Sequence, residues 1–136
     1  MPLPERVLID TSAFYALISA NDDFHQQARQ TYESLIDREQ EMWTTSYILV
    51  EMAALVHRRL GFDPLRIFME VIEPVVQVFW VDHTVHNAAW RQLVASRGAG
   101  LGLVDRTTAL AAGHLRAHVF TFDRGFARQG IPVVPK

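Results

Sequence analysis

Residues 6–12 are Arg-Val-Leu-Ile-Asp-Thr-Ser, a short apolar run that ends abruptly in a carboxylate. Because polar and apolar residues do not alternate in it, the run favours a strand that is buried on both faces of a parallel sheet. In open α/β sheets, ligands bind outside the carboxyl ends of the strands, where successive connections leave in opposite directions. We therefore expect Asp10 to lie at a binding edge, although an Asp before a helix is more often a simple cap.

The rest of the chain alternates strand patterns with helix patterns. Apolar residues at helical spacing predict helices at residues 13–18, 24–36, 48–60, 65–72, 85–93 and 103–115. Runs of β-prone residues predict further strands at residues 42–45, 75–81, 118–122 and 131–134. Thr11 or Ser12 is the expected cap of the first helix, and Asp63 with Pro64 the expected start of the fourth. This alternation implies right-handed crossovers and a mainly parallel sheet with helices on both faces, in one domain that spans residues 1–136.

Composition narrows the possible function classes. The 136 residues, of which 49% are apolar and 21% charged, are enough to bury a core, and the net charge of −2 lacks the basic excess of proteins that hold nucleic acid by electrostatics alone. The sequence contains no cysteine, which excludes disulfides, thiolate catalysis and cysteine-based zinc sites. No stretch approaches the roughly 20 apolar residues of a membrane span, so we expect a soluble, cytoplasmic protein. A phosphate-bearing substrate would need local basic residues or bound cations.

Four of the 15 acidic residues stand where no helix or strand pattern requires them: Asp10, Glu51, Asp105 and Asp123. Glu51 lies beside the apolar face of its predicted helix, and Asp105 lies in or near the first turn of a buried one. Asp123 directly follows the strand at residues 118–122, as Asp10 follows the first strand. Because parallel strands end at the same edge of a sheet, we expect Asp10 and Asp123 to lie close together.

Each of these acids alone has an ordinary structural explanation. Asp105 is most simply a helix cap, Glu51 an exposed or arginine-paired residue, and Asp123 a turn former before Gly125. Four carboxylates brought together would repel and desolvate one another unless a cation neutralised them. Mg²⁺ and Mn²⁺ are hard cations that take such oxygen ligands and leave positions for water and phosphate. Clustering would therefore imply a metal site.

Four segments carry a resemblance to a known family. They are Val7 to Ser12, Ser46 to Glu51, Leu101 to Asp105, and Thr121 to Phe126 with Gly130 behind it. Their order and spacing resemble the PIN domain nucleases, and the chain length and the closing Thr-Phe-Asp-x-x-Phe pattern are most similar to the VapC-type toxins of toxin–antitoxin pairs. Two positions depart from the family pattern. Gly102 stands where a Ser or Thr is common, and Arg106 stands where a small residue or Cys often follows the third acid.

The resemblance implies a five-stranded parallel sheet of strand order 3-2-1-4-5, with an acidic pocket between the first and fourth strands. It also implies a Mg²⁺- or Mn²⁺-dependent endoribonuclease that is inhibited by a cognate antitoxin and forms a homodimer. In this hypothesis one or two cations activate a water for in-line attack on the RNA phosphate. The ligands would be Asp10, Asp105 and Asp123, with Glu51 binding directly or through water.

Four residues beside these motifs are candidates for supporting roles. Ser12 and Thr121 would orient the carboxylates or the attacking water, with plain cap and strand-end hydrogen bonds as the alternative. Arg106 and Arg124 would contact RNA phosphates, with paired or solvated surface arginines as the alternative.

Two other functions fit the same residues. A PIN-like RNA-binding module that has lost its chemistry would keep the fold, although all four acids are present in this chain. A metal-dependent DNA nuclease or phosphatase would need the same acidic cluster. A cleavage assay on RNA and single-stranded DNA, with Mg²⁺, Mn²⁺ or EDTA, separates these possibilities.

Overall fold

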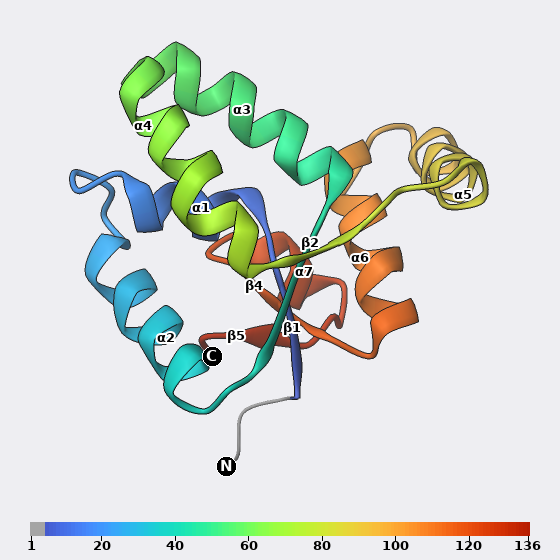
Figure 1. Ribbon diagram of the computed structural model, residues 1–136. Coiled ribbons are helices and arrows are strands. Elements are labelled where there is room, and N and C mark those ends of the chain that lie inside the picture. Colours follow the sequence, from blue (N-terminus) through green and yellow to red (C-terminus); the bar gives the residue numbers. More distant parts are fainter. Residues whose placement is uncertain (1–4) are drawn as a thin grey trace.

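The computed structural model describes residues 5–136, and its sheet consists of five parallel strands (Figure 1). They are β1 (Arg6–Ile9), β2 (Glu41–Thr45), β3 (Gln77–Phe79), β4 (His118–Phe120) and β5 (Val133–Val134). The order β3-β2-β1-β4-β5 is the predicted one, and all four strand pairs are parallel. The order changes direction between β1 and β4, so the edge at which their carboxyl ends meet is the expected place for a ligand.

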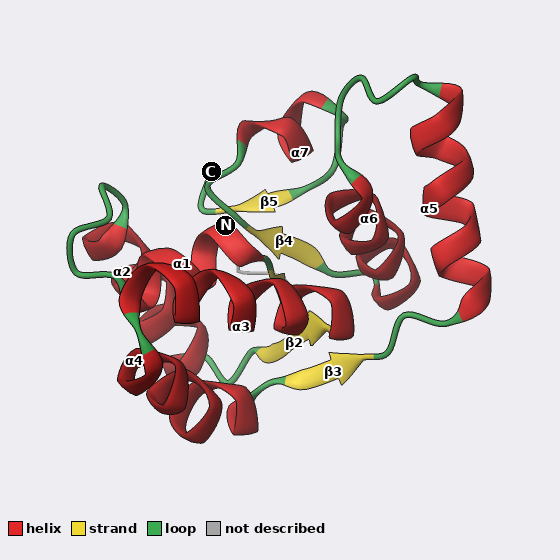
Figure 2. Ribbon diagram, turned by 90° about the horizontal axis from the view of Figure 1, so that it is seen from above, coloured by secondary structure: helices red, strands yellow, loops and turns green. Residues whose placement is uncertain are grey.

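Helices connect the strands and cover both faces of the sheet. They are α1 (Thr11–Ile18), α2 (His25–Asp37), α3 (Ser46–Leu60), α4 (Phe62–Ile67), α5 (His83–Ala95), α6 (Leu103–Leu115) and α7 (Arg124–Arg128), and a π-helix (Phe68–Ile72) and a 3-10 helix (Glu73–Val75) follow α4. Figure 2 shows α1 to α4 on one side of the sheet and α5 and α6 on the other. Right-handed crossovers require this arrangement, because the connections before and after β3 cross the sheet in opposite directions. No helix within residues 5–136 is long and apolar enough to cross a membrane.

The two central strands form the buried centre of the molecule. All three residues of the apolar run at 7–9 have no exposed surface, and neither do Val119 and Phe120 in β4. Burial of each such side chain contributes about 1.5–3 kcal/mol to folding, so β1 and β4 are firmly held side by side. The residues that follow these strands therefore have well-defined positions.

The strand predicted at residues 75–81 is shorter in the structure. Only Gln77–Phe79 pair with β2, and they form an edge strand of the sheet. Val75 ends the 3-10 helix and is 52% exposed, and Trp80, beyond the strand, is 72% exposed. The residues of this segment favour a β conformation, which is why a longer strand was predicted. An edge strand has only one neighbour, and pairing with that neighbour sets its length.

The structure also differs from the predicted helices in two places. The helix predicted at residues 65–72 begins directly after Gly61, so Asp63 and Pro64 lie in its first turn, and its second half is a π-helix. Gly61 has a φ of 97°, in the left-handed region that favours glycine. Helix α7 was not predicted, because five residues are too few to show an amphipathic pattern.

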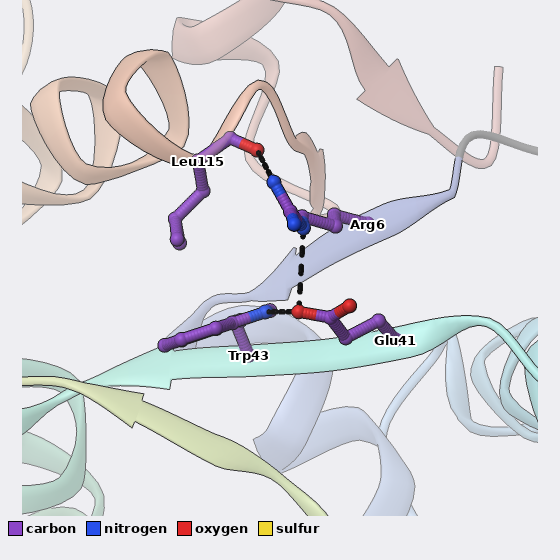
Figure 3. Close-up of polar contacts among 4 residues, drawn as sticks. All are labelled: Arg6, Glu41, Trp43 and Leu115. Atoms are coloured by element: carbon purple, nitrogen blue, oxygen red, sulfur yellow. Dashed lines mark hydrogen bonds and ion pairs between the residues drawn. The ribbon is translucent and has the colours of Figure 1, made fainter.

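Paired polar groups close the amino edge of the sheet, where β1 and β2 begin (Figure 3). Arg6 Nε lies 3.3 Å from Glu41 Oε1, and Trp43 Nε1 donates a hydrogen bond to the same oxygen at 2.6 Å. Arg6 also donates through Nη1 to the carbonyl oxygen of Leu115, at the end of α6, at 3.2 Å. These contacts tie two strands and a helix together at this edge.

Candidate active site

A cavity of about 410 Å³ lies at the carboxyl edge of the sheet. Its lining includes all four acids that stood out in the sequence, namely Asp10 after β1, Glu51 in α3, Asp105 in α6 and Asp123 after β4. The other lining residues are Thr11, Ser12, Tyr15, Asp22, Phe24, Leu55, Arg59 and Phe122. The fold thus brings together four acids that are far apart in the sequence.

Asp10 is the most constrained of the four acids. It is 3% exposed, and its Oδ1 accepts hydrogen bonds from the backbone N–H of Ala13 at 3.0 Å and from the hydroxyl of Ser12 at 2.8 Å. Its Oδ2 accepts a hydrogen bond from the hydroxyl of Thr121 at 2.6 Å. The prediction that Thr11 or Ser12 caps the first helix was wrong, because Asp10 itself occupies the cap position of α1. Asp10 therefore serves both as a helix cap and as part of the cavity wall.

Two hydroxyl groups join the ends of β1 and β4. Ser12 Oγ accepts a hydrogen bond from the backbone N–H of Phe122, and Thr121 Oγ1 accepts one from the backbone N–H of Asp123, both at 2.9 Å. The two hydroxyl oxygens lie 3.2 Å apart, but each has a single proton, so no proton remains for this contact while both donate to Asp10. The two hydroxyls thus fix the carboxylate of Asp10 and the backbone that presents Asp123.

The other three acids are less enclosed. Asp123 is exposed and caps α7, since its Oδ1 accepts a hydrogen bond from the backbone N–H of Gly125 at 2.8 Å. Asp105 lies partly buried in the first turn of α6, whose cap position is occupied by Gly102. Glu51 is exposed on α3. Within residues 5–136, the carboxylates of Asp105 and Glu51 form neither a hydrogen bond nor an ion pair, so both are available to a ligand.

Burial and mutual repulsion raise the pKa of two of the acids. Burial raises the pKa of Asp10 from 3.8 to about 6, although the hydrogen bonds to its carboxylate oppose the shift. Burial, together with the negative charges of Asp10, Asp123 and Glu51, raises the pKa of Asp105 from 3.8 to about 7. Near neutral pH, Asp105 therefore holds a proton for a substantial part of the time.

The set of donor groups fits a hard divalent cation. All four are carboxylates, and Asp105 and Glu51 have no protein partner that a cation would have to displace. A bound cation would also offset the repulsion that raises the pKa of Asp105. In the described part of the chain, no three acidic or histidine side chains already converge closely enough to hold an ion. The acids thus surround the cavity without forming a complete coordination shell.

The two arginines predicted to contact RNA do not line the cavity. Arg106 donates hydrogen bonds to the carbonyl oxygens of Leu101 at 2.7 Å and Ala99 at 2.6 Å, and to the hydroxyl of Ser96 at 2.9 Å. Its guanidinium therefore holds the loop that precedes α6. Arg124 is exposed at the first position of α7.

Four polar or aromatic residues of the cavity were not singled out in the sequence: Tyr15, Asp22, Phe24 and Arg59. Arg59 had a detectable signal, because it follows Glu51 by eight residues and Leu55 by four, a spacing that places all three on one side of a helix. The other three residues carry no such signal. They belong to α1 and to the segment before α2, whose approach to the cavity depends on the tertiary fold.

Comparison with solved structures shows the same fold at low sequence identity. The chain is 24% identical to VapC20 of Mycobacterium tuberculosis, a sarcin–ricin loop cleaving toxin, with a TM-score of 0.82 and coverage of 94% of this chain and 98% of the toxin. It is 18% identical to FitAcB of Neisseria gonorrhoeae, with a TM-score of 0.71 and coverage of 93% and 95%. It is 14% identical to VapBC2 of Rickettsia felis, which is bound to a promoter DNA fragment, with a TM-score of 0.71 and coverage of 94% and 96%. No curated protein matches the sequence.

The sequence also matches a protein family over almost its whole length. The match is to the PIN domain and extends over residues 7–131, so it includes Asp10, Glu51, Asp105 and Asp123. The strand order, the cavity at the carboxyl edge and this match agree with one another, and the chain belongs to the PIN domain family.

Proposed function

We propose that this protein is a metal-dependent endoribonuclease and the toxin of a toxin–antitoxin pair. One observation carries the proposal: Asp10, Glu51, Asp105 and Asp123 reach a single cavity from four separate parts of the fold. Gathering four carboxylates costs folding free energy, because the charges repel one another and lose water. A cluster with this cost is best explained by a cation that it binds. Membership of the PIN domain family and the likeness to a VapC toxin support a nuclease.

In this proposal Asp10, Asp105 and Asp123 bind one or two Mg²⁺ or Mn²⁺ ions, and Glu51 binds directly or through water. These residues would hold a cation whose Lewis-acid chemistry would make a water a better nucleophile and would offset the charge on the phosphate during in-line attack. Breakage of the phosphodiester bond then leaves a 5′-phosphate and a 3′-hydroxyl.

Hydrogen-bond accounting assigns the ligand atom of Asp10. Its Oδ1 accepts two hydrogen bonds and has no lone pair left, whereas its Oδ2 accepts one and retains the other lone pair. Oδ2 would therefore be the oxygen that holds a cation, and the hydrogen bond from the Thr121 hydroxyl would orient it. Asp105, whose pKa is about 7 without a cation, would be deprotonated when it binds one.

A cleavage assay on the purified protein tests this proposal. RNA and single-stranded DNA of one sequence are incubated with the protein in Mg²⁺, Mn²⁺ or EDTA. We expect the RNA to be cut with either cation and to stay intact in EDTA. Asp10→Asn should abolish cleavage without unfolding the protein, because the amide oxygen can still accept the cap hydrogen bond. Asp37→Asn is the matched control, since Asp37 is an exposed acid at the end of α2, outside the cavity.

The outcomes separate the competing functions. Cleavage of DNA alone would identify a DNA nuclease, and binding of RNA without cleavage would identify a silent module. Full activity of highly purified Asp10→Asn protein would remove the acidic cavity from the mechanism.

The antitoxin partner is proposed from the structural neighbours and from an apolar surface. The neighbours include the VapBC2 complex, and large apolar side chains are exposed along α3, α4 and the π-helix, namely Val50, Phe62, Ile67, Met69 and Val71. We expect the product of an adjacent reading frame to bind this cytoplasmic protein, and the protein alone to form a homodimer. Coexpression, copurification and a cleavage assay of the complex test the partner, and light scattering of the isolated protein tests the dimer. Cleavage that persists at full occupancy by that product would contradict the toxin assignment.

A further inference from the structure

Three phenylalanine rings lead from the core to the acidic cavity. Phe120 in β4 is fully buried, and its ring meets the ring of Phe122 edge-on, with the centroids 5.9 Å apart and the planes at 68°. Phe24 stacks face to face on Phe122, with the centroids 4.7 Å apart and the planes within 9°. Phe24 is 45% exposed, and no other ring of the described residues stacks on it. The series therefore ends in a ring that is partly exposed to solvent and lines the cavity.

Backbone contacts hold Phe24 in place. Its N–H donates a hydrogen bond to Asp22 Oδ1 at 2.9 Å, and its carbonyl oxygen accepts one from the N–H of Ala28 at 2.8 Å. Because Phe24 is 45% exposed, part of the hydrophobic stabilisation that full burial of its ring would give is absent. An ordered, exposed ring in a cavity wall suits a ligand that covers it.

Arg59 brings a positive charge into the same cavity. Its guanidinium carbon lies 5.7 Å from the centre of the Tyr15 ring, a cation–π contact that holds the side chain against α1. Although five acidic residues line this cavity, neither an ion pair nor a hydrogen bond joins the guanidinium to any residue in the range 5–136. Its N–H donors are therefore free, and a guanidinium can bind two phosphate oxygens at once.

We infer that Phe24 and Arg59 bind an unpaired nucleotide of the RNA substrate, with a base stacked on the Phe24 ring and a phosphate held by Arg59. The inference rests on the proposed function and narrows its substrate class. A base can stack on a side chain only when its face is free, whereas the bases of a duplex cover one another. Because every base has a flat face, the site selects single-stranded segments and loops and not a particular sequence.

A protein partner could also cover an exposed phenylalanine. The position of the ring favours RNA, because the ring, the acids and Arg59 line one cavity. A nucleotide supplies both a flat face for Phe24 and an anion for Arg59. An apolar protein side chain would use the ring and leave the guanidinium without a partner.

Fluorescence binding experiments test the inference with an eight-nucleotide single-stranded RNA that contains 2-aminopurine, whose emission falls when it stacks on a ring. Ca²⁺ replaces Mg²⁺, and a denaturing gel confirms that the strand stays intact. Phe24→Leu removes the ring, and Phe24→Trp restores a stacking surface. Phe62→Leu is the matched control, since Phe62 is 64% exposed and does not line the cavity.

We expect Phe24→Leu to weaken binding of the single strand about tenfold and to abolish the fall in emission, because one base loses its stacking partner. Phe24→Trp and Phe62→Leu should match the unaltered protein. None of the three changes should alter the weaker binding of a duplex of the same sequence.

The phosphate contact is tested by the salt dependence of binding. Loss of one phosphate contact to a single strand lowers the slope of log K against log salt concentration by about 0.7. We expect this decrease for Arg59→Gln and a smaller one for Arg58→Gln, since Arg58 is the exposed neighbour in α3 and lies outside the cavity lining.

Failure of the inference can be told apart from failure of the proposed function. If the unaltered protein cuts RNA but Phe24→Leu binds the single strand as well as Phe62→Leu does, the inference alone is overturned. It is also overturned if Phe24→Leu weakens binding of the antitoxin and leaves RNA affinity unchanged. If the unaltered protein binds no RNA, both the inference and the proposed function are contradicted.

Discussion

Charged side chains are paired with opposite charges at one edge of the sheet and gathered with like charges at the other. At the amino edge, Arg6 and Glu41 form an ion pair, and Trp43 donates to the same carboxylate (Figure 3). At the carboxyl edge, Asp105 and Glu51 lie beside Asp10 and Asp123 in one cavity, and neither Asp105 nor Glu51 has a partner within residues 5–136. Repulsion from these acids adds to burial in raising the pKa of Asp105.

The difference suggests that the amino edge contributes to stability and that the carboxyl edge serves the proposed function. The half-exposed ion pair of Arg6 and Glu41 adds at most about 1 kcal/mol to the free energy of unfolding. Its two charges are opposite, so neither destabilises the fold. The acids of the carboxyl edge lower the stability of the fold when they are ionised. Stability therefore does not explain why acidic residues are gathered there. The cation that we propose would supply the reason, and the two edges should respond differently to a change of charge.

The largest expected difference is in cleavage. Asp105→Asn should lower the rate of RNA cleavage by about 10²–10³-fold, because a group that stabilises charge in the transition state is removed. Glu41→Gln makes the same kind of change at the amino edge and should leave the rate unaltered. Initial rates in Mg²⁺ under single-turnover conditions measure the effect of each substitution on cleavage. Equal rates for the two variants would mean that the two edges do not differ in function.

Thr121→Val tests the hydroxyl that connects the two strand ends. The change leaves Asp10 Oδ2 without its donor and the N–H of Asp123 without its acceptor, so it should lower the free energy of unfolding by about 1–3 kcal/mol and reduce cleavage. Thr44→Val is the matched control, since the buried Thr44 hydroxyl donates to the carbonyl oxygen of Ile9 at 3.1 Å and lies outside the cavity lining. We expect urea denaturation to show similar losses for both variants, with cleavage reduced only in Thr121→Val. A normal rate for Thr121→Val would mean that the hydroxyl has no effect on Asp10 beyond stability.

Stability without metal should depend on pH through the carboxyl edge. The folded chain holds protons on Asp105, with a pKa of about 7, and on Asp10, with a pKa of about 6, whereas the unfolded chain releases them near the ordinary value of 3.8. The folded state therefore binds more protons, and the free energy of unfolding in EDTA should fall as the pH rises from about 4 to about 7. Urea denaturation at several pH values measures this slope. It should be shallower for Asp105→Asn and unchanged for Glu41→Gln, and identical slopes would contradict the assigned cause.

The smallest expected effect is the stability of the amino edge itself. Glu41→Gln should lower the free energy of unfolding by about 0.5 kcal/mol, because the ion pair with Arg6 is half exposed while the amide oxygen can still accept from Trp43. High salt should weaken the unaltered pair and so reduce the difference between the two proteins. A loss that persists unchanged in high salt would indicate that packing, and not charge, accounts for it.

The sequence predicted the parts of the site that belong to strand ends and regular helices. Asp10 and Asp123 were found because an apolar run that stops at a carboxylate marks the end of a buried strand. Glu51 and Asp105 were found from their places on helices. Regular spacing placed each acid on its own strand end or helix, whereas the expectation that all four share one pocket came from the resemblance to the PIN domain nucleases.

The remaining features depend on contacts that local patterns do not record. The edge strand β3 is three residues long although seven residues are β-prone, because pairing sets its length. Asp22 and Phe24 reach the cavity through the packing of a loop. Arg106 looked like a phosphate contact beside an acid, but its guanidinium is engaged by the loop before α6.

The most direct test of the account is the melting temperature of the unaltered protein and of Asp105→Asn at pH 8, each in EDTA and in Mg²⁺ or Mn²⁺. The Asp105 carboxylate accepts no hydrogen bond from the described residues, so its replacement removes the cost of burying a charge and the repulsion from the neighbouring acids. The account predicts that Asp105→Asn melts a few degrees higher than the unaltered protein in EDTA, and that the cation raises the melting temperature of the unaltered protein by more than that of the variant. A variant that melts lower in EDTA and responds equally to the cation would contradict it.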